Sequence, residues 1–459
     1  MRISRVLSVV MLCAFCTSLS AAPKLKVSEN KRFLVYDDGK PFFYLGDTAW
    51  ELFHRLNREH AVQYLQDRAA KRFNVIQAVV LAEFDGLTAP NAYGHLPLKN
   101  NDPLQPIEAY FEHVDFVVNE AEKLGLFVGM LPTWGDKITK AWGVGPEIFT
   151  PENAEKYGEF LGKRYREKPI IWIIGGDRNP DKPEYQAIWR AMAKGLRKGD
   201  GGTHLITYHP SGGRSSAEWF HADEWLDFNM MQNGHDVNVP VWERIGREYQ
   251  RTPIKPVLDG EPLYEDHPIA FKPKERGFSD AADIRKFAYW DVFSGACGHT
   301  YGNHCVWQMF TPERKPVNFP QFTWNIALDR PGATQMKYLR NLMESRPYLT
   351  RIPDQSMIVN DISAGGKKII ATRDSEGKYA MVYVPASRNF VMRLDKLVGA
   401  KLVGWWYNPR TGVASKIDEV KKLHSIEFTP PDVGENIDWV LVIDSADAKF
   451  DAPGKVSIK

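Results

Sequence analysis

The feature that most constrains the fold of this 459-residue chain is a repeated alternation of short apolar runs and amphipathic stretches. The alternation extends from about residue 42 to residue 309. It is typical of parallel strands joined by helices, because a parallel strand needs a long crossover before the next strand can pair with it. The expected strands lie at residues 42–45, 75–81, 127–131, 170–174, 205–208, 228–231, 256–258 and around 299–307.

Eight such runs fit a closed α/β barrel of the (β/α)8 TIM type. The expected helices lie at residues 59–71, 107–124, 151–166, 183–197, 281–293 and 333–343. An open doubly wound sheet is the alternative, and it usually has a glycine-rich phosphate-binding turn after its first strand. In this chain the corresponding segment is GDTAW at 46–50, with one glycine and a bulky aromatic residue, so we favour the barrel.

The pattern changes after residue 347 to short alternating strands, which indicate a β-sandwich. They are expected at residues 357–359, 368–371, 379–384, 390–394, 402–407, 425–428 and 439–443. We therefore expect a barrel domain over residues 23–348 and a smaller all-β sandwich domain over residues 349–459. No long flexible linker separates the two, so we expect them to pack together.

The first 22 residues have the layout of a cleaved signal peptide. Arg2 and Arg5 precede an apolar run at 6–15, and small residues follow at 18–22. That run is too short to span a bilayer comfortably, and no later one is long enough, so we expect an exported protein without membrane insertion. Cleavage would remove both arginines and cancel the formal net charge of +2. No basic excess then remains to bind nucleic acid.

The residues that follow each apolar run are the candidates for the active site, because a closed α/β barrel places its site at the carboxyl ends of the strands. Here they combine aromatic rings with carboxylates, amides and imidazoles. Such a mixture suits a sugar, which offers C–H faces and hydroxyl groups, so we expect an oligosaccharide or polysaccharide substrate. The expected substrate-binding residues are Asp47, Trp50, Glu83, Trp134, His209, Gln232, Asn233, Tyr264, His299, Tyr301 and Trp307.

Two carboxylates are placed to cleave a glycosidic bond, which requires an acid for the leaving oxygen and a second carboxylate as nucleophile or base. Asp177 follows the run IIWIIGG at the end of the fourth strand, and Glu261 follows PVLDG at the end of the seventh. Strands four and seven face each other across a barrel. The two side chains can therefore converge on one bound sugar.

Other roles remain open for these carboxylates. Asp177 also suits a helix cap or an ion pair in the polar loop that precedes the helix at 183–197. Glu261 could be a paired loop glutamate, with Asp259 as a rival carboxylate. Glu83 could replace Asp177 as the acid, because it follows a strand among aromatic residues that would raise its pKa by desolvation.

With these residues identified, the chain resembles barrel glycosidases that place an acid/base after strand four and a nucleophile after strand seven. More closely, it resembles the apiosidase-like glycoside hydrolases of family 140. The resemblance covers nearly the whole mature chain and rests on FYLGDTAW at 43–50, GGDRN at 175–179, GEP at 260–262 and GHTYGNH at 298–304. The C-terminal part resembles the domain that is labelled collagen-binding in that family.

This resemblance implies a bacterial, periplasmic or secreted enzyme that cleaves apiose linkages in the side chains of the pectin rhamnogalacturonan II. It also implies that Asp177 is the acid/base and Glu261 the nucleophile. One departure is that barrel glycosidases usually have an Asn-Glu pair after strand four, whereas this chain has Gly176-Asp177. The shorter side chain requires a closer approach of backbone or substrate. We favour a retaining reaction, which the sequence alone does not fix.

Two other function classes compete with a glycosidase. A non-catalytic glycan-binding protein could use the barrel mouth together with Trp405, Trp406 and Tyr407 of the sandwich. A metal-dependent hydrolase would need a ligand set, for which His209, His235, His299, His304 and Asp47 are the candidates, but their spacing matches no zinc motif. We expect neither a metal nor a cofactor. Cys297 and Cys305 are expected to be structural, and their spacing leaves open whether they form a disulfide.

Overall fold

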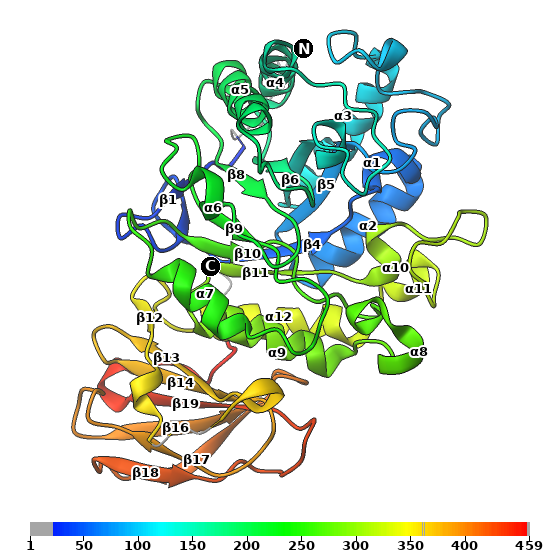
Figure 1. Ribbon diagram of the computed structural model, residues 1–459. Coiled ribbons are helices and arrows are strands. Elements are labelled where there is room, and N and C mark those ends of the chain that lie inside the picture. The colour runs from blue at the N-terminus through cyan, green and yellow to red at the C-terminus, as the bar shows by residue number, and fades with distance from the viewer. Residues whose placement is uncertain (1–21, 360, 362, 457–459) are drawn as a thin grey trace, which may run out of the picture.

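The computed structural model describes residues 22–359, 361 and 363–456. The predicted signal peptide therefore lies outside the described residues, except for Ala22. Figure 1 shows a barrel of strands and helices, coloured from blue to yellow, and a β-rich domain in orange and red packed beside helices α9 and α12. None of the helices in the described part of the chain is both long enough and apolar enough to cross a membrane.

Eight strands form the barrel, and every assigned pair among them is parallel. Six pair in the order β11-β4-β5-β6-β7-β8, and β9 pairs with β10. Two further backbone hydrogen bonds close the barrel. Between β8 and β9, Asp227 N–H donates to the carbonyl oxygen of Ile206 (2.9 Å). Between β10 and β11, Cys297 N–H donates to the carbonyl oxygen of Val257 (2.8 Å). The predicted (β/α)8 barrel is confirmed. The strands are β4 (Tyr44–Thr48), β5 (Val75–Leu81), β6 (Phe127–Thr133), β7 (Ile170–Gly175), β8 (Ile206–His209), β9 (Asn229–Met231), β10 (Val257–Asp259) and β11 (Gly298–Tyr301).

The six helices expected from the sequence lie close to their predicted positions, and the helix at residues 241–249 was not among them. The long ones are α2 (Arg58–Ala70), α3 (Glu108–Lys123), α4 (Pro151–Tyr165), α5 (Pro183–Asp200), α7 (Val241–Tyr249), α9 (Ala281–Phe293) and α12 (Pro331–Glu344). The short ones are α1 (Leu52–Arg55), α6 (Ala217–Phe220), α8 (Pro273–Arg276), α10 (His304–Trp307) and α11 (Trp324–Ala327), with 3-10 turns at Lys99–Asn101, Gly135–Lys137, Ile269–Phe271, Gln355–Met357, Gly365–Lys367 and Ala446–Ala448. The segment expected as a strand at 299–307 splits in two, because the Asn303 side chain accepts hydrogen bonds from the backbone of Cys305 and Val306 and so begins α10.

The end of the barrel opposite the site is covered by a small antiparallel sheet of β1 (Leu25–Val27), β2 (Leu34–Tyr36) and β3 (Pro41–Phe42). The rings of Tyr36 and Phe42 lie 6.4 and 5.3 Å from the ring of Phe127, the first residue of β6. This contact covers the amino end of β6. The opposite, carboxyl ends remain free to form a pocket.

The C-terminal domain is the predicted β-sandwich. One antiparallel sheet has the order β12-β13-β14-β19-β16-β17, and β15 and β18 form the second layer. The strands are β12 (Arg351–Pro353), β13 (Ile370–Asp374), β14 (Tyr379–Val384), β15 (Phe390–Arg393), β16 (Leu402–Tyr407), β17 (Ala414–Val420), β18 (Ser425–Phe428) and β19 (Trp439–Ser445). Two predictions were wrong at the edges. The strand expected at 357–359 is absent, since Met357 ends a 3-10 turn and Ile358 forms only an isolated bridge to Met392, and the edge strands β12 and β17 were not predicted.

The two domains pack together, as predicted. The guanidinium group of Arg285 in α9 pairs with Asp438 (2.8 Å), and that of Arg346 pairs with Asp444 (2.7 Å). Tyr289 of α9 stacks on Tyr383 of β14 with ring centroids 4.6 Å apart. Among the sandwich aromatics suggested for glycan binding, only Tyr407 is shown in this contact, where it donates to the carbonyl oxygen of Tyr338 (2.8 Å). Trp406 lies in the sandwich core, and Trp405 is partly buried against the neighbouring core cluster.

Candidate active site

A pocket of about 300 Å³ opens at the carboxyl ends of the barrel strands. It brings together most of the residues predicted from the sequence. Those among its lining are Trp50, Glu83, Trp134, Asp177, Gln232, Glu261, Tyr264 and Trp307. Three acidic residues therefore share one hollow with four large aromatic side chains, which is the composition expected of a sugar-cleaving site.

The turn after β7 carries Asp177 into the pocket. Gly175, Gly176 and Asp177 have φ values of 101°, 120° and 52°, so three successive residues adopt a left-handed conformation. A side chain at Gly175 would collide with the carbonyl oxygen of His209, and a Cβ on Gly176 would lie 2.8 Å from the nitrogen of Gly135. Only glycine fits both positions.

Asp177 has its pKa raised to about 6. Burial is the main cause and the negative charge of Glu261 the next, while Arg178, His209 and Trp142 oppose the increase. The guanidinium group of Arg178 lies 2.8 Å from the carboxylate, and the indole N–H of Trp142 donates to it at 3.2 Å. The helix-cap alternative was wrong, because Lys182 occupies the N-cap position of α5.

Glu261 is held in the opposite state. Burial alone would raise its pKa, but contacts with His209 and His235 lower the pKa to about 2. Nε2 of His209 lies 3.1 Å from one carboxylate oxygen, and Nε2 of His235 lies 3.1 Å from the other. The carboxylate is therefore ionised at any pH near neutrality, although its residue is only 6% exposed.

His209 links the two carboxylate residues. The backbone N–H of Asp177 donates to Nδ1 of His209 at 3.2 Å, so Nδ1 is an acceptor and Nε2, which lies 3.1 Å from a Glu261 carboxylate oxygen, carries the hydrogen. The imidazole is fully buried, and its centroid lies 5.4 Å from that of Trp50 and 6.1 Å from that of Trp134. His209, predicted to bind substrate, is absent from the pocket lining and contacts Asp177 and Glu261 instead.

Glu83 lies in the same pocket with its pKa raised to about 8, by burial first and then by Asp177, against the opposing effect of Arg178. The guanidinium group of Arg178 lies 3.4 Å from Glu83 and thus contacts both carboxylates. A largely protonated carboxyl group can donate a hydrogen bond to a sugar hydroxyl. Asp259 was the alternative to Glu261 as the second carboxylate. It accepts hydrogen bonds from the backbone and the side chain of Asn233, at 3.2 and 2.8 Å, and is absent from the pocket lining.

Besides His209 and Asn233, three more predicted substrate-binding residues lie outside the pocket. The Asp47 carboxylate pairs with Arg68 (2.7 Å) and accepts from Tyr64, His299 Nδ1 lies 2.7 Å from Asp291, and Tyr301 donates to Glu265 (2.6 Å). All three are fully buried.

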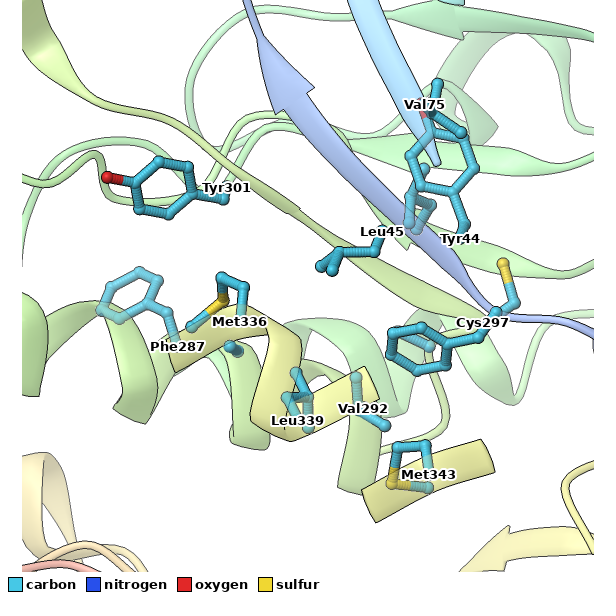
Figure 2. Close-up of a cluster of buried hydrophobic side chains, with 14 of the residues drawn as sticks. Tyr44, Leu45, Val75, Phe287, Val292, Cys297, Tyr301, Met336, Leu339 and Met343 are labelled. Atoms are coloured by element: carbon cyan, nitrogen blue, oxygen red, sulfur yellow. The ribbon is translucent and has the colours of Figure 1, made fainter. Parts of the chain in front are cut away.

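The cause of this error is the alternation of side chains along a strand. Leu45 pairs with His299 and Asp47 with Tyr301, so these four residues share the face directed toward the helices. Figure 2 shows Leu45 and Tyr301 on the side of the strands that faces Phe287 of α9 and Met336 of α12. Thr300 and Gly46 occupy the alternate positions. A polar residue at a strand end thus reaches the pocket only when its register directs it inward.

The structure adds pocket residues that sequence reasoning missed. His235 was considered only as a metal ligand, yet it contacts Glu261 and stacks on His267 with centroids 4.0 Å apart. Its place just after β9 was a usable signal. Trp142 and Phe271 line the pocket from loops, where no periodic pattern identifies them. Asn233 lies in an adjoining pocket rather than this one.

The histidines considered as metal ligands and the two cysteines of the mature chain have other surroundings than a metal site or a disulfide would require. Within the described residues, no three His, Cys, Asp or Glu side chains gather in a way that could hold a metal ion. His304 instead bonds the carbonyl oxygens of Val317 and Asn318 at 3.1 and 2.8 Å. Cys297 and Cys305 are both free and buried, so they form no disulfide with each other.

Comparison with known proteins gives matches over both domains. Residues 28–350 match the family described as apiosidase-like, catalytic domain, and residues 352–444 match a domain labelled as the collagen-binding domain of a collagenase. A solved structure named "Glycoside hydrolase" is 34% identical, with 92% of this chain and 97% of the other covered and a TM-score of 0.85. A glycoside hydrolase family 5 structure from Bacteroides vulgatus is also 34% identical, with 92% and 94% coverage and a TM-score of 0.85. No curated protein matches this chain.

Proposed function

The chain belongs to the apiosidase-like family of glycoside hydrolases, and on that basis we propose that it cleaves an apiose linkage in the side chains of the pectin rhamnogalacturonan II. The family description supports the choice of apiose. The size of the pocket, about 300 Å³, is at the lower end of the range for ligand sites and suits a single small sugar ring.

We infer a two-carboxylate mechanism from the opposite pKa shifts in one pocket. Asp177 protonates the leaving oxygen while ionised Glu261 attacks the anomeric carbon, and the glycosidic C–O bond breaks as the bond to Glu261 forms. Asp177, now ionised, then takes a proton from water, whose oxygen displaces Glu261 and restores both groups. The retaining outcome is part of this proposal, in which Glu261 acts as the nucleophile, and the configuration of the first product anomer decides it.

The proposal includes export. Two arginines, an apolar run and a small-residue end within residues 1–22 support a cleaved signal peptide and a periplasmic or secreted enzyme. Mass spectrometry of the mature N-terminus after expression in a bacterium with a periplasm tests this part. An intact Met1 on correctly folded, active protein would contradict it.

The test of the activity is incubation of purified protein with rhamnogalacturonan II fragments. We expect release of free apiose, linkage analysis that shows loss of the apiosyl bond, and proton NMR in which the first product anomer retains the substrate configuration. Binding without any new reducing end would favour the glycan-binding alternative. Loss of cleavage on addition of EDTA would favour a metal-dependent hydrolase.

A further inference from the structure

Residues 138–147, called here the Trp142 loop, bring an exposed tryptophan against the proposed acid. The loop follows β6 and the 3-10 turn Gly135–Lys137. Trp142 is 65% exposed, and its indole N–H donates to Asp177 at 3.2 Å. Ala141, just before it, has a φ of 42°, a left-handed conformation that a residue other than glycine keeps only where surrounding contacts impose it. The position of this indole therefore depends on an anchor elsewhere in the loop.

Asp136, the middle residue of that 3-10 turn, is the anchor. Its Oδ2 accepts hydrogen bonds from the backbone N–H groups of Val144 and Gly145, at 3.2 and 2.9 Å. Its Oδ1 lies 2.7 Å from Nζ of Lys137. The carbonyl oxygen of Lys137 accepts from the N–H of Ile148 at 2.9 Å, which closes the base of the loop. One carboxylate thus joins the start of the Trp142 loop to its end.

The ion pair of Asp136 and Lys137 is fully buried, with both side chains 0% exposed. Taking two charges out of water costs about as much free energy as their attraction returns, so a buried pair is a weak source of stability. It does fix geometry, because an ionised carboxylate is a stronger acceptor for backbone N–H groups than a neutral oxygen. The consequence of this pair is therefore the fixed position of the Trp142 loop.

The Trp142 loop packs between its anchor and Arg178. A Cβ on Gly143 would lie 2.4 Å from Cβ of Asp136 and 2.6 Å from Nη2 of Arg178, so only glycine allows this close approach. The Arg178 guanidinium lies 4.3 Å from the ring centre of Trp142 and 2.8 Å from the carboxylate of Asp177. A shift of the loop would therefore disturb both groups that touch the proposed acid.

We propose that Asp136 is a positioning residue for the cleavage reaction, which fixes the Trp142 loop so that its indole and the neighbouring guanidinium hold Asp177 toward the glycosidic oxygen. Asp136 does not line the pocket and so acts through other residues. Lys137 supplies the charge that balances it. The inference rests on the proposed glycosidase function and adds a residue that touches neither the substrate nor the reacting atoms.

Two double variants separate the anchor from the buried ion pair, which both of them remove through Lys137→Met. Asp136→Asn/Lys137→Met keeps a side-chain oxygen for the two backbone N–H groups, whereas Asp136→Ala/Lys137→Met removes it. On rhamnogalacturonan II oligosaccharides, kcat/KM of the alanine variant should be about tenfold below that of the asparagine variant, as expected for lost hydrogen bonds. Circular dichroism and urea denaturation check both folds. Lys140→Gln is the control, because Lys140 is exposed in the same loop.

Two further measurements show whether the effect passes through the acid. When both double variants also carry Trp142→Ala, their kcat/KM values should differ by less than about threefold, because the positioned indole is gone. With an aryl glycoside, whose leaving group needs no proton, the difference should likewise shrink to less than about threefold. Persistence of the full difference in either measurement, or equal kcat/KM of the two double variants on the oligosaccharides, would overturn the inference while leaving the proposed function intact.

If the wild type cleaves none of these substrates, the proposed function fails, and hydrogen exchange then decides the anchor. Mass spectrometry of peptides that span residues 141–148 should show the amides of Val144 and Gly145 protected in the wild type and in the asparagine variant. In the alanine variant they should exchange about tenfold faster, because the loop opens more often. Equal exchange in all three proteins would show that Asp136 does not hold the loop.

Discussion

The turn after β7 and the turn after β10 present the same functional group to the same pocket in opposite states. The β10 side buries Glu261 between two imidazoles, which lower its pKa to about 2. The β7 side places Asp177 beside Trp142 at the pocket, where burial and the charge of Glu261 raise its pKa to about 6. Environment, and not residue type, thus separates a permanently ionised carboxylate from one that can hold a proton.

The largest expected effect tests the Glu261 side. Glu261→Gln removes the proposed nucleophile with little change in shape, so kcat should fall by about a thousandfold or more. Steady-state kinetics on pectic fragments measures it, with Glu243→Gln as a control because Glu243 is exposed on α7. Retention of more than a tenth of wild-type kcat would remove Glu261 from the mechanism.

Asp177→Asn tests the other side and should lower kcat by about a hundredfold or more on natural substrate. The loss should shrink with an aryl glycoside, whose leaving group needs no proton. In the wild type the acid must be protonated, so activity should fall as the pH rises through about 6, and this limb should vanish in the variant. Asp181→Asn, an exposed aspartate in the same loop, is the control. An unchanged alkaline limb would assign the acid to another group, with Glu83 the first candidate.

The histidine contacts provide an intermediate test. His235→Ala removes one of the two groups that favour ionised Glu261, so the pKa of Glu261 should rise and the acidic limb of the pH profile should move upward. We expect kcat/KM to fall about ten- to hundredfold, the range for a hydrogen bond to a charged group. Circular dichroism checks the fold. A fall in kcat/KM with no movement of the acidic limb would show that His235 acts only by packing.

Trp142→Phe should have a smaller effect, since it keeps a ring but removes the N–H that donates to Asp177. That donor favours the ionised carboxylate, so its loss should raise the pKa of Asp177 and move the alkaline limb to higher pH. kcat/KM should fall by only about two- to fivefold, and further in Trp142→Ala, where the stacking surface is also lost. A shift of the limb to lower pH would contradict the assigned contact.

The smallest effect on activity is expected for Tyr301→Phe, which lies behind the barrel wall. Loss of its hydrogen bond to Glu265 should reduce the free energy of unfolding by about 1 kcal/mol. Urea denaturation measures this, and kcat/KM should remain within twofold of wild type. A tenfold loss of kcat/KM at unchanged stability would instead indicate that Tyr301 takes part in substrate binding.

Much of this site could be predicted because each barrel strand, and the residue that follows it, can be recognised from a short stretch of sequence. Asp177 and Glu261 each follow an apolar run directly, and the geometry of a closed barrel then brings their strands face to face. Asp47, His299 and Tyr301 follow equally clear runs but were misplaced, because register decides which residue of each pair points inward. Trp142 and Phe271 could not be identified, since each lies in a loop whose position depends on contacts far away in the chain.

The order of strands and helices, the two domains and the carboxylates at the strand ends were fixed by periodicity and by residue type, which are properties of neighbouring residues. The inward or outward direction of each side chain and the two histidines around Glu261 were decided only in three dimensions. The physical reason is that pKa values and pocket walls depend on burial and on charges within a few ångströms, and these neighbours come from segments that are distant in the sequence.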